Sequence, residues 1–399
     1  MNVRTMLTKL VSLVTFNMHK TRQQAVLACV HSLANGSAGT VTSIGRGIRS
    51  KAYEKHRIKR ADRLLSNQAL RQDIPALYTA ISHVFCHAKH PVIAIDWSDL
   101  DDHKGHFLLR AAMTLKGRSV TLYQEVHSNS TKEKPATHKR FLTKLSSVLP
   151  SQCQPIIVTD AGFKSPWFRL VQAMQWHFVG RVRKPHFYSV DQGSRWQCIT
   201  HLYQQATARA KRFERAKIAR NRPFDCTLVL IKQPSKGRHA TNPDGSHKQS
   251  GQSIKHAQSA NDPWLLATSL PLHRKLAKQV VGIYRQRMQI EEGFRDMKSR
   301  RFGLGVEQSH SIKPDRLTVL MLLTTLASLM MLLLGMVIWK SGKHRRFQAN
   351  TSTNPTLSWH SLGLRGMATA FTFTHSQWQR AMDWFYTCID EAWLGEGKI

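Results

Sequence analysis

Residues 155–160 read PIIVTD, a short apolar run that ends in a carboxylate. Residues 92–96, VIAID, have the same form. Runs of this kind predict buried strands, and open α/β sheets place their chemistry beyond the carboxyl ends of their strands. Asp96 and Asp160 are therefore candidate site residues, although an aspartate at the end of a single strand is more often a helix cap or a turn residue.

The segments around these two runs alternate between strand and helix patterns, which predicts a mixed α/β sheet. Residues 1–90 instead carry apolar residues at spacings of three and four between basic stretches, and we expect helices there. Elsewhere we expect strands at residues 107–114, 119–126, 177–182, 224–231 and 264–269, and helices at residues 132–149, 167–175, 272–301 and 376–393.

The composition indicates an anionic partner. The 399 residues include 59 Lys and Arg against 24 Asp and Glu, a formal net charge of +35. A hydrophobic content of 41% excludes a disordered basic tail, so the charge lies on folded surface. Nucleic acid is the leading partner, because phosphate contacts release counterions, and an acidic membrane surface is the alternative. The six cysteines include no CxxC pair, which favours a reduced, cytosolic setting without a zinc ribbon.

One segment is apolar enough to cross a membrane. Residues 317–339 are 23 positions without a charged side chain, and ~20 apolar residues span a bilayer. A helix buried in the core of a large domain has the same composition, so the segment alone leaves both possibilities open.

The helix expected at residues 272–301 carries an unusual set of polar side chains on one face. With about 100° between successive residues, a stripe about 60° wide contains Tyr284, Arg287, Glu291 and Lys298. Arg and Lys suit phosphate, Glu suits a metal ion, and Tyr can donate a hydrogen bond. Carboxylates of this kind can hold Mg²⁺, and two such ions ~3.5–4 Å apart can activate a nucleophile at a phosphate. A solvated helix face with a Glu–Lys pair is the alternative.

The spacing Tyr284-x2-Arg287-x3-Glu291-x6-Lys298 resembles the signature of the insertion sequence four family of bacterial DDE transposases. The stretch VTDAGF at residues 158–163, together with GRVRK at residues 180–184, resembles the second motif of that family. The run VIAID at residues 92–96 resembles the first motif. The pattern is most similar to the transposon-ten type of transposase, and it covers roughly the residues from Pro91 to Arg301.

This resemblance implies a ribonuclease-H-like fold: a mixed sheet with helices on both faces, interrupted by a β-rich insertion, with helical N-terminal and C-terminal regions. Similar enzymes cut a mobile element at its terminal inverted repeats, form a hairpin on its end, and join the 3′-OH to target DNA. The resemblance makes Asp96, Asp160 and Glu291 the catalytic residues and the ligands of two Mg²⁺ ions, for which Mn²⁺ can substitute.

The resemblance also assigns DNA contacts. It implies that phosphates at the element's end are held by Tyr284, Arg287 and Lys298. Trp264 stands where the family has a tryptophan that stacks on a flipped-out base, which is worth ~1–3 kcal/mol. The alternative for Trp264 is an ordinary core residue of its strand.

The resemblance divides the chain into five segments. These are a helical DNA-binding region at 1–90, the first part of the catalytic core at 91–184, a β-rich insertion at 185–270, the second part of the core at 271–345 and a C-terminal helical region at 346–399. The polar insert at residues 233–262 shows no motif of its own. We expect residues 317–339 to be a buried helix, because a membrane span close behind Glu291 would tether a site that must enclose DNA.

The expected partners are transposon-end DNA and target DNA, with a homodimer in the synaptic complex and no membrane contact. The expected location is the bacterial cytoplasm, in association with the nucleoid. Two other functions remain open at this stage. One is a structure-selective, ribonuclease-H-like DNA nuclease, and the other is a catalytically inactive DNA-binding relative.

Overall fold

The computed structural model describes residues 3–101, 105–115, 117–191, 193–234, 246, 250–251, 261–354, 356–369 and 371–394. The chain divides into two compact units. Unit 1 contains Met1–Pro155 and Gln286–Leu394, and unit 2 contains Ile156–Arg285 and Gly395–Ile399.

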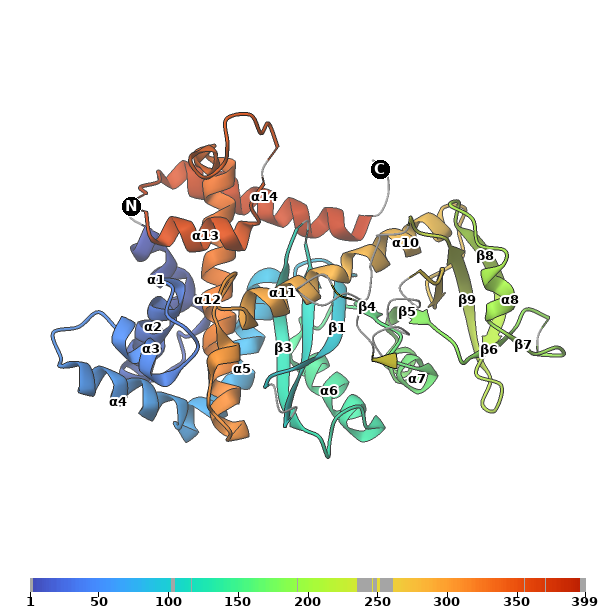
Figure 1. The fold of residues 1–399 in the computed structure, drawn as a ribbon, viewed down its shortest axis with the longest axis horizontal. Coiled ribbons are helices and arrows are strands. Elements are labelled where there is room, and N and C mark those ends of the chain that lie inside the picture. The colour runs from blue at the N-terminus through green and yellow to red at the C-terminus, as the bar shows by residue number, and fades with distance from the viewer. Residues whose placement is uncertain are drawn as a thin grey trace. The chain divides into compact units, whose positions relative to one another are not determined.

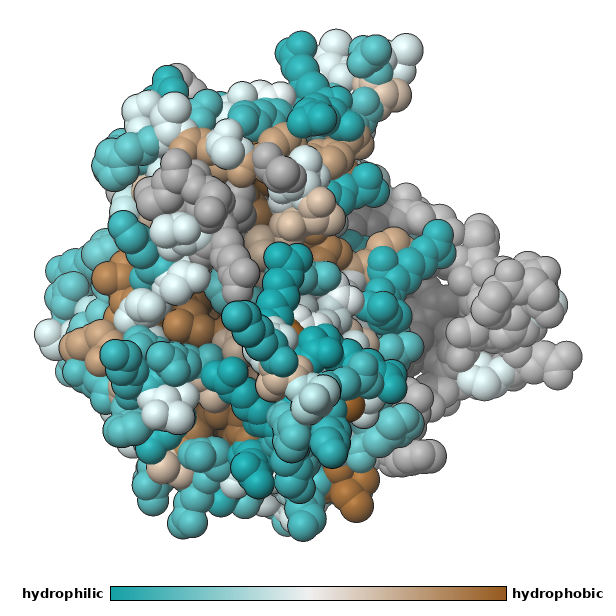
Figure 2. Space-filling model, turned by 90° about the vertical axis from the view of Figure 1, so that its left-hand side faces the viewer, coloured by the Kyte–Doolittle hydropathy of each residue, from teal (hydrophilic) through white to brown (hydrophobic). Residues whose placement is uncertain are grey.

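Unit 1 begins with five helices, as the apolar spacing of residues 1–90 predicts (Figure 1). Side chains cap the N-termini of two of these helices. The Thr40 side chain accepts a hydrogen bond from the backbone amide of Ser43, and the Asn67 side chain accepts one from the backbone amide of Leu70. Figure 2 views the molecule from the side on which these helices lie, and hydrophilic residues cover most of that face. The five helices are α1 (Val3–Val14), α2 (Lys20–Ala34), α3 (Val41–Gly47), α4 (Glu54–Leu65) and α5 (Gln68–Phe85).

The sheet of unit 1 has three antiparallel strands, β1 (Val92–Asp99), β2 (His106–Thr114) and β3 (Ser119–Ser128). Successive residues of a strand point to opposite faces. On one face, Arg110 of β2 contacts helix α11 (Met288–Lys298), and on the other Trp97 of β1 contacts helix α6 (Pro135–Val148). Helices therefore contact both faces of this sheet.

The apolar segment forms the long helix α12 (Pro314–Lys340), which is the one helix in the described part of the chain with the length and composition to cross a membrane. Its most apolar stretch of 18 residues is 83% buried inside the protein, so the expectation of a buried helix is confirmed. Two glycines allow close packing: a Cβ on Gly335 would lie 1.7 Å from the Trp359 carbonyl oxygen, and one on Gly363 would lie 1.9 Å from that of Met331. The remaining elements of unit 1 are η1 (Val306–Gln308), η2 (Lys343–Phe347), α13 (Trp359–Met367) and α14 (His375–Leu394).

Unit 2 is built on a second set of strands. In the described residues of this unit, β4 (Ile156–Thr159) and β5 (His177–Val182) pair in parallel, and the other strand pairs are antiparallel. Phe168 of α7 stacks on Phe178 of β5 with centroids 4.5 Å apart, and Gly180 leaves room for that ring. In sheet order the strands are β4 (Ile156–Thr159), β5 (His177–Val182), β10 (Trp264–Thr268), β9 (Phe224–Ile231), β8 (Lys211–Ile218), β6 (Phe187–Ser189) and β7 (Gln197–Cys198); the helices are α7 (Ser165–Ala173), α8 (Thr200–Tyr203) and α10 (Leu276–Gln286).

The prediction of one helix at residues 272–301 is wrong in one respect. The segment forms two helices, α10 and α11, separated at Arg287. Arg287 keeps helical angles (φ −52°, ψ −33°), but the amide of Ile290 bonds the carbonyl of Arg287, three residues back. This tighter bond interrupts the ladder of four-residue bonds that a continuous α-helix needs. Most of the polar insert at 233–262 lies outside the described residues.

Candidate active site and DNA-binding residues

Asp96 sits on the central part of β1, where the neighbouring strand places Arg110 directly opposite. Its Oδ1 accepts a hydrogen bond from the backbone amide of Trp97 at 2.8 Å. Its Oδ2 accepts one from the Arg287 guanidinium, with Nη1 and Oδ2 3.1 Å apart. The side chain is only 13% exposed. The carboxylate is therefore enclosed by one cationic donor and one amide donor.

Glu291 lies in the first turn of α11, one turn after Arg287. The second amino group of Arg287, Nη2, donates to Glu291 Oε1. The guanidinium is 11% exposed, whereas the Glu291 side chain is 41% exposed. Asp96 and Glu291 are therefore brought together around one shared cation, although they are far apart in sequence.

Asp160 belongs to unit 2 and follows the last residue of β4. The amide of Gly162 donates to its Oδ1 at 2.8 Å, which holds the carboxylate in the turn that leads to α7. The predicted strand and the carboxylate at its end are both present. Its membership of a catalytic triad stays a prediction.

Trp264 and Tyr284, both predicted to contact DNA, pack against each other in unit 2. Their ring centroids lie 4.9 Å apart and the ring planes meet at 76°, the edge-to-face geometry that aromatic pairs prefer. Tyr284 is 4% exposed, and Trp264, the first residue of β10, is half-buried. Lys298, the fourth residue of the predicted stripe, is half-buried at the last position of α11.

Arg110 is a buried cation that the sequence analysis missed. It lies opposite Asp96 and is 5% exposed. Its Nε donates to Gln124 Oε1 at 2.8 Å, and its guanidinium lies 4.8 Å from the ring centroid of Phe294 on α11. Burial lowers its pKa to about 10. A lone arginine inside the apolar run FLLRAAM is the signal that could have revealed it.

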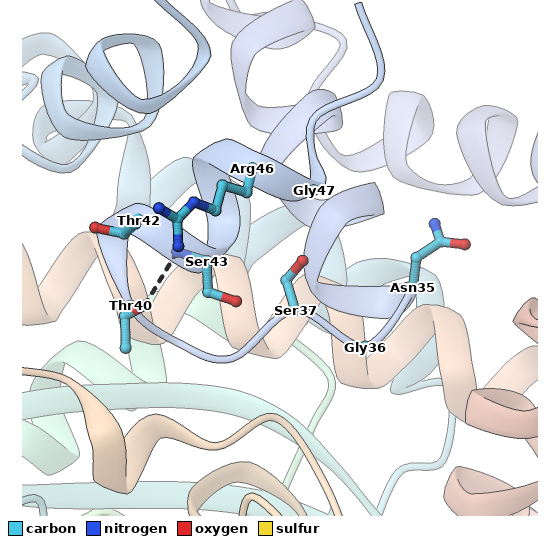
Figure 3. A pocket seen from close by; sticks show the side chains of 8 residues that line it. All are labelled: Asn35, Gly36, Ser37, Thr40, Thr42, Ser43, Arg46 and Gly47. Carbon is cyan, nitrogen blue, oxygen red and sulfur yellow. Dashed lines mark hydrogen bonds between the residues drawn. The ribbon is translucent and has the colours of Figure 1, made fainter. Parts of the chain in front are cut away.

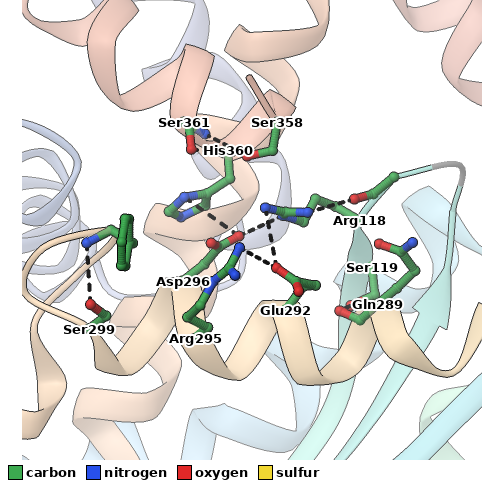
Figure 4. A network of polar contacts seen from close by, with 12 residues as sticks. Arg118, Ser119, Gln289, Glu292, Arg295, Asp296, Ser299, Ser358, His360 and Ser361 are labelled. Atoms are coloured by element: carbon green, nitrogen blue, oxygen red, sulfur yellow. Dashed lines mark hydrogen bonds and ion pairs between the residues drawn. The ribbon is translucent and has the colours of Figure 1, made fainter. Parts of the chain in front are cut away.

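A second polar cluster links α11 to α13 and to the turn between β2 and β3 (Figure 4). Asp296 is 4% exposed, and its Oδ2 accepts a hydrogen bond from Arg118 Nε at 2.7 Å. Nδ1 of His360, from α13, lies 3.7 Å from the same oxygen. Burial lowers the pKa of His360. Because Asp296 is five residues beyond Glu291 on the same short helix, this cluster fixes the position of the helix that carries the candidate carboxylate.

The helical N-terminal region contains a polar pocket of about 420 Å³ beside α3 (Figure 3). Its lining includes one cation, Arg46, and no carboxylate. Arg46 also forms an ion pair with Glu54, 2.8 Å away. The other lining residues are Asn35, Gly36, Ser37, Thr40, Thr42, Ser43 and Gly47.

The donor chemistry at Asp96 and Glu291 fits a hard divalent cation, which takes oxygen ligands. In the structure these two carboxylates already converge on a cation, the Arg287 guanidinium. Among the residues that the structure describes, no group of three or more His, Cys, Asp or Glu side chains could hold a metal ion.

Comparison with known proteins identifies the family. The family model of the transposase DDE domain matches residues 87–330, which is more than half of the chain. The match spans β1 to β10, α11 and most of α12, and so includes the seven predicted site residues Asp96, Asp160, Trp264, Tyr284, Arg287, Glu291 and Lys298. No curated protein matches the chain. The chain thus belongs to the family of transposases with a DDE domain.

Proposed function

We propose that this DDE transposase cuts DNA at the terminal inverted repeats of a mobile element and joins the 3′-OH ends to target DNA. The catalytic carboxylates of the proposal are Asp96, Asp160 and Glu291. The observation that carries it is the convergence of Asp96 and Glu291 on the Arg287 guanidinium inside a chain of the transposase DDE family. The spacing of the Tyr-Arg-Glu-Lys residues supports the insertion sequence four family and the transposon-ten type.

The proposed cofactor is a pair of Mg²⁺ ions, with Mn²⁺ as a substitute, held by the same three carboxylates. When bound, such ions polarise the phosphate and offset charge on the attacking and leaving oxygens. Asp96 and Glu291 each offer carboxylate oxygens that Arg287 neutralises in the structure. Arg287 would move from these oxygens to the phosphate of bound DNA, which a guanidinium can contact through two parallel hydrogen bonds.

DNA contacts of three kinds complete the proposal. Lys298 and Tyr284 would hold phosphates near the cut, and Trp264 would stack on a base that is flipped out when a hairpin forms. The partial exposure of Trp264 leaves ring surface for such a contact, while Tyr284 fixes the orientation of its indole. The helical N-terminal region, with the carboxylate-free pocket beside Arg46, would bind the transposon end. A homodimer would bring two ends together, in the cytoplasm.

A strand-transfer assay separates this function from its alternative, a structure-selective DNA nuclease of the same fold. Purified protein is mixed with pre-cut inverted-repeat ends, a supercoiled target plasmid and Mg²⁺. The proposal expects covalent joining of the 3′-OH ends to the plasmid, with target duplication at the junction. Plasmid nicking without joining would favour the nuclease. Binding of the ends without any cleavage or joining would favour an inactive relative.

A further inference from the structure

The C-terminal end of α12 carries a group of basic side chains, Lys340, Lys343, Arg345 and Arg346, which we call the basic cap. They stand at the last residue of α12 and in the 3₁₀ helix η2. Lys340, Arg345 and Arg346 are exposed, and Lys343 is half-exposed. Within the described part of the chain, no ion pair to a carboxylate involves any of the four. The cap therefore keeps its positive charge.

Aromatic rings, rather than carboxylates, hold three of these cations. The Lys340 ammonium lies 4.2 Å from the ring centroid of Trp384, and that of Lys343 lies 4.8 Å from that of Phe373. The Arg346 guanidinium lies 5.4 Å from the ring of Phe371. A cation over an aromatic face is attracted by the ring quadrupole but is not neutralised by it.

The rings belong to a packed aromatic platform. Trp384 stacks on Trp339 at 4.7 Å and meets Trp359 edge-on at 5.0 Å. Phe373 meets Trp378 edge-on at 5.9 Å, and Trp378 is 2% exposed. Because the platform is part of the core of unit 1, the cations it supports lose less side-chain entropy on binding than free surface lysines would.

We propose that the basic cap binds the phosphate backbone of duplex DNA without reading its sequence, and that this duplex is the target DNA. The inference rests on the proposed function, which requires a target. Four cations within seven residues suit a dense row of phosphates, and each phosphate contact releases counterions. η2 spans only five residues, and phosphate contacts position a duplex without specifying its sequence.

An acidic membrane surface is less well matched to the cap. Membrane-surface segments combine basic residues with exposed apolar side chains that enter the lipid boundary. In the described residues, none of the exposed large hydrophobic side chains belongs to the cap or its platform. The cap thus offers charge without an apolar anchor, which suits nucleic acid.

The test compares two variants with equal loss of charge. The cap variant carries Lys340→Gln, Lys343→Gln, Arg345→Gln and Arg346→Gln. The control variant carries Lys134→Gln, Lys139→Gln, Arg140→Gln and Lys313→Gln, four exposed cations of unit 1 that lie outside both the cap and the helical N-terminal region. Affinity for a labelled duplex of arbitrary sequence is measured at several NaCl concentrations. The slope of log Kd against log salt should fall by about 2–4 in the cap variant, and the control should keep the wild-type slope.

A third variant, Lys340→Arg with Lys343→Arg, keeps the charge and should bind the duplex like the wild type. This result would show that the cap variant binds more weakly because it has lost charge, and not because it is misfolded. Equal slopes for the cap and control variants would overturn the proposal. The proposal would also be overturned if the cap variant bound phosphatidylserine vesicles more weakly than the wild type but bound the duplex equally well. With pre-cut ends, the cap variant should lose strand transfer while the wild type keeps it. If the wild type joins no DNA but its duplex binding depends on the cap, the proposed function fails and the DNA surface stands.

Discussion

Arg287 donates to Asp96 with Nη1 and Oδ2 3.1 Å apart, while its other amino group binds Glu291. One guanidinium thereby bridges two carboxylates that are far apart in the sequence. Arg287 therefore stabilises a place in the fold where two carboxyl groups meet, because like charges left without a cation would repel.

Replacing Arg287 by Gln should therefore destabilise the metal-free protein. We expect the free energy of unfolding in EDTA to fall by about 2 kcal/mol, because Asp96 loses a charged partner in a mostly buried place while Glu291 remains partly solvated. Mg²⁺ should restore part of the loss. Urea unfolding with and without Mg²⁺ measures this. Arg287→Lys, which keeps the charge, serves as the control. Equal stability of all three proteins in EDTA would refute the prediction.

Trp264 is expected to act after the first cut, when a base must leave the duplex. Trp264→Ala should slow hairpin formation on a pre-nicked end by roughly 5- to 150-fold, the range that corresponds to ~1–3 kcal/mol of base stacking. Trp264→Phe, which keeps a stacking surface, should lose much less. Gel analysis of pre-nicked ends separates hairpins from nicked substrate. A similar loss in the initial nicking step would instead indicate a structural role against Tyr284.

Asp296 should be a stability residue rather than a catalytic one. Asp296→Asn removes the buried carboxylate that lies nearest to the Arg118 guanidinium, so we expect the free energy of unfolding to fall by about 3 kcal/mol. Glu292→Gln, which removes a carboxylate 3.8 Å from Arg118 on the more exposed side, should cost less than about 1 kcal/mol. Urea unfolding of the two variants tests the contrast. Equal losses would show that the buried pair is not what holds α11.

His138 predicts a pH dependence of stability. Its pKa is lowered from 6.5 to about 4, first by burial and then by the nearby His127. Neutral His138 accepts a hydrogen bond from Trp97 Nε1 at 3.3 Å. Between these two pKa values, His138 binds a proton in the unfolded chain but not in the folded protein. The free energy of unfolding should thus fall as the pH drops from about 6.5 toward 4, by at most about 3 kcal/mol, and stay constant above that window.

Urea unfolding across that pH range checks the His138 prediction. His138→Gln cannot titrate but can still accept from Trp97, so its stability should depend less on pH than that of the wild type. His375→Gln, at an exposed histidine of α14, should keep the wild-type profile. Identical profiles for wild type and His138→Gln would show that other groups set the acid response.

The sequence predicted the local parts of the fold and site well. The runs VIAID and PIIVTD both form strands, because short apolar runs bounded by polar residues have few other solutions. The prediction that a carboxylate ends each strand holds for Asp160 and is wrong for Asp96, because pairing with β2 extends β1 to Asp99. The pairing of Arg287 with Glu291 follows from a spacing of four residues around a helical turn. The composition of residues 317–339 allowed both a membrane span and a buried helix. We predicted the buried helix because a span close behind Glu291 would tether a site that must enclose DNA, and α12 is buried.

The remaining features depend on contacts between residues far apart in the chain. The sequence pattern did not single out the place of Arg110 opposite Asp96, or the meeting of Asp296 with Arg118 and His360. The break at Arg287 could not be predicted either, because no Pro or Gly stands at residues 283–292 to mark it. Strand register and tertiary hydrogen bonds decide these features, and neither has a local signature.

The central claim is that Asp96, Asp160 and Glu291 form one metal-dependent catalytic centre. The most direct measurement is Mg²⁺-dependent cleavage of an inverted-repeat end by Asp96→Ala, Asp160→Ala and Glu291→Ala, with end binding measured in parallel. Asp99→Ala on the same strand and Asp225→Ala in unit 2 serve as controls, since their side chains are more exposed than that of Asp96 and each pairs with a lysine, Lys132 and Lys217. Each triad variant should lose cleavage and keep DNA binding, and the controls should cut normally. Wild-type cleavage by any one triad variant would contradict the account.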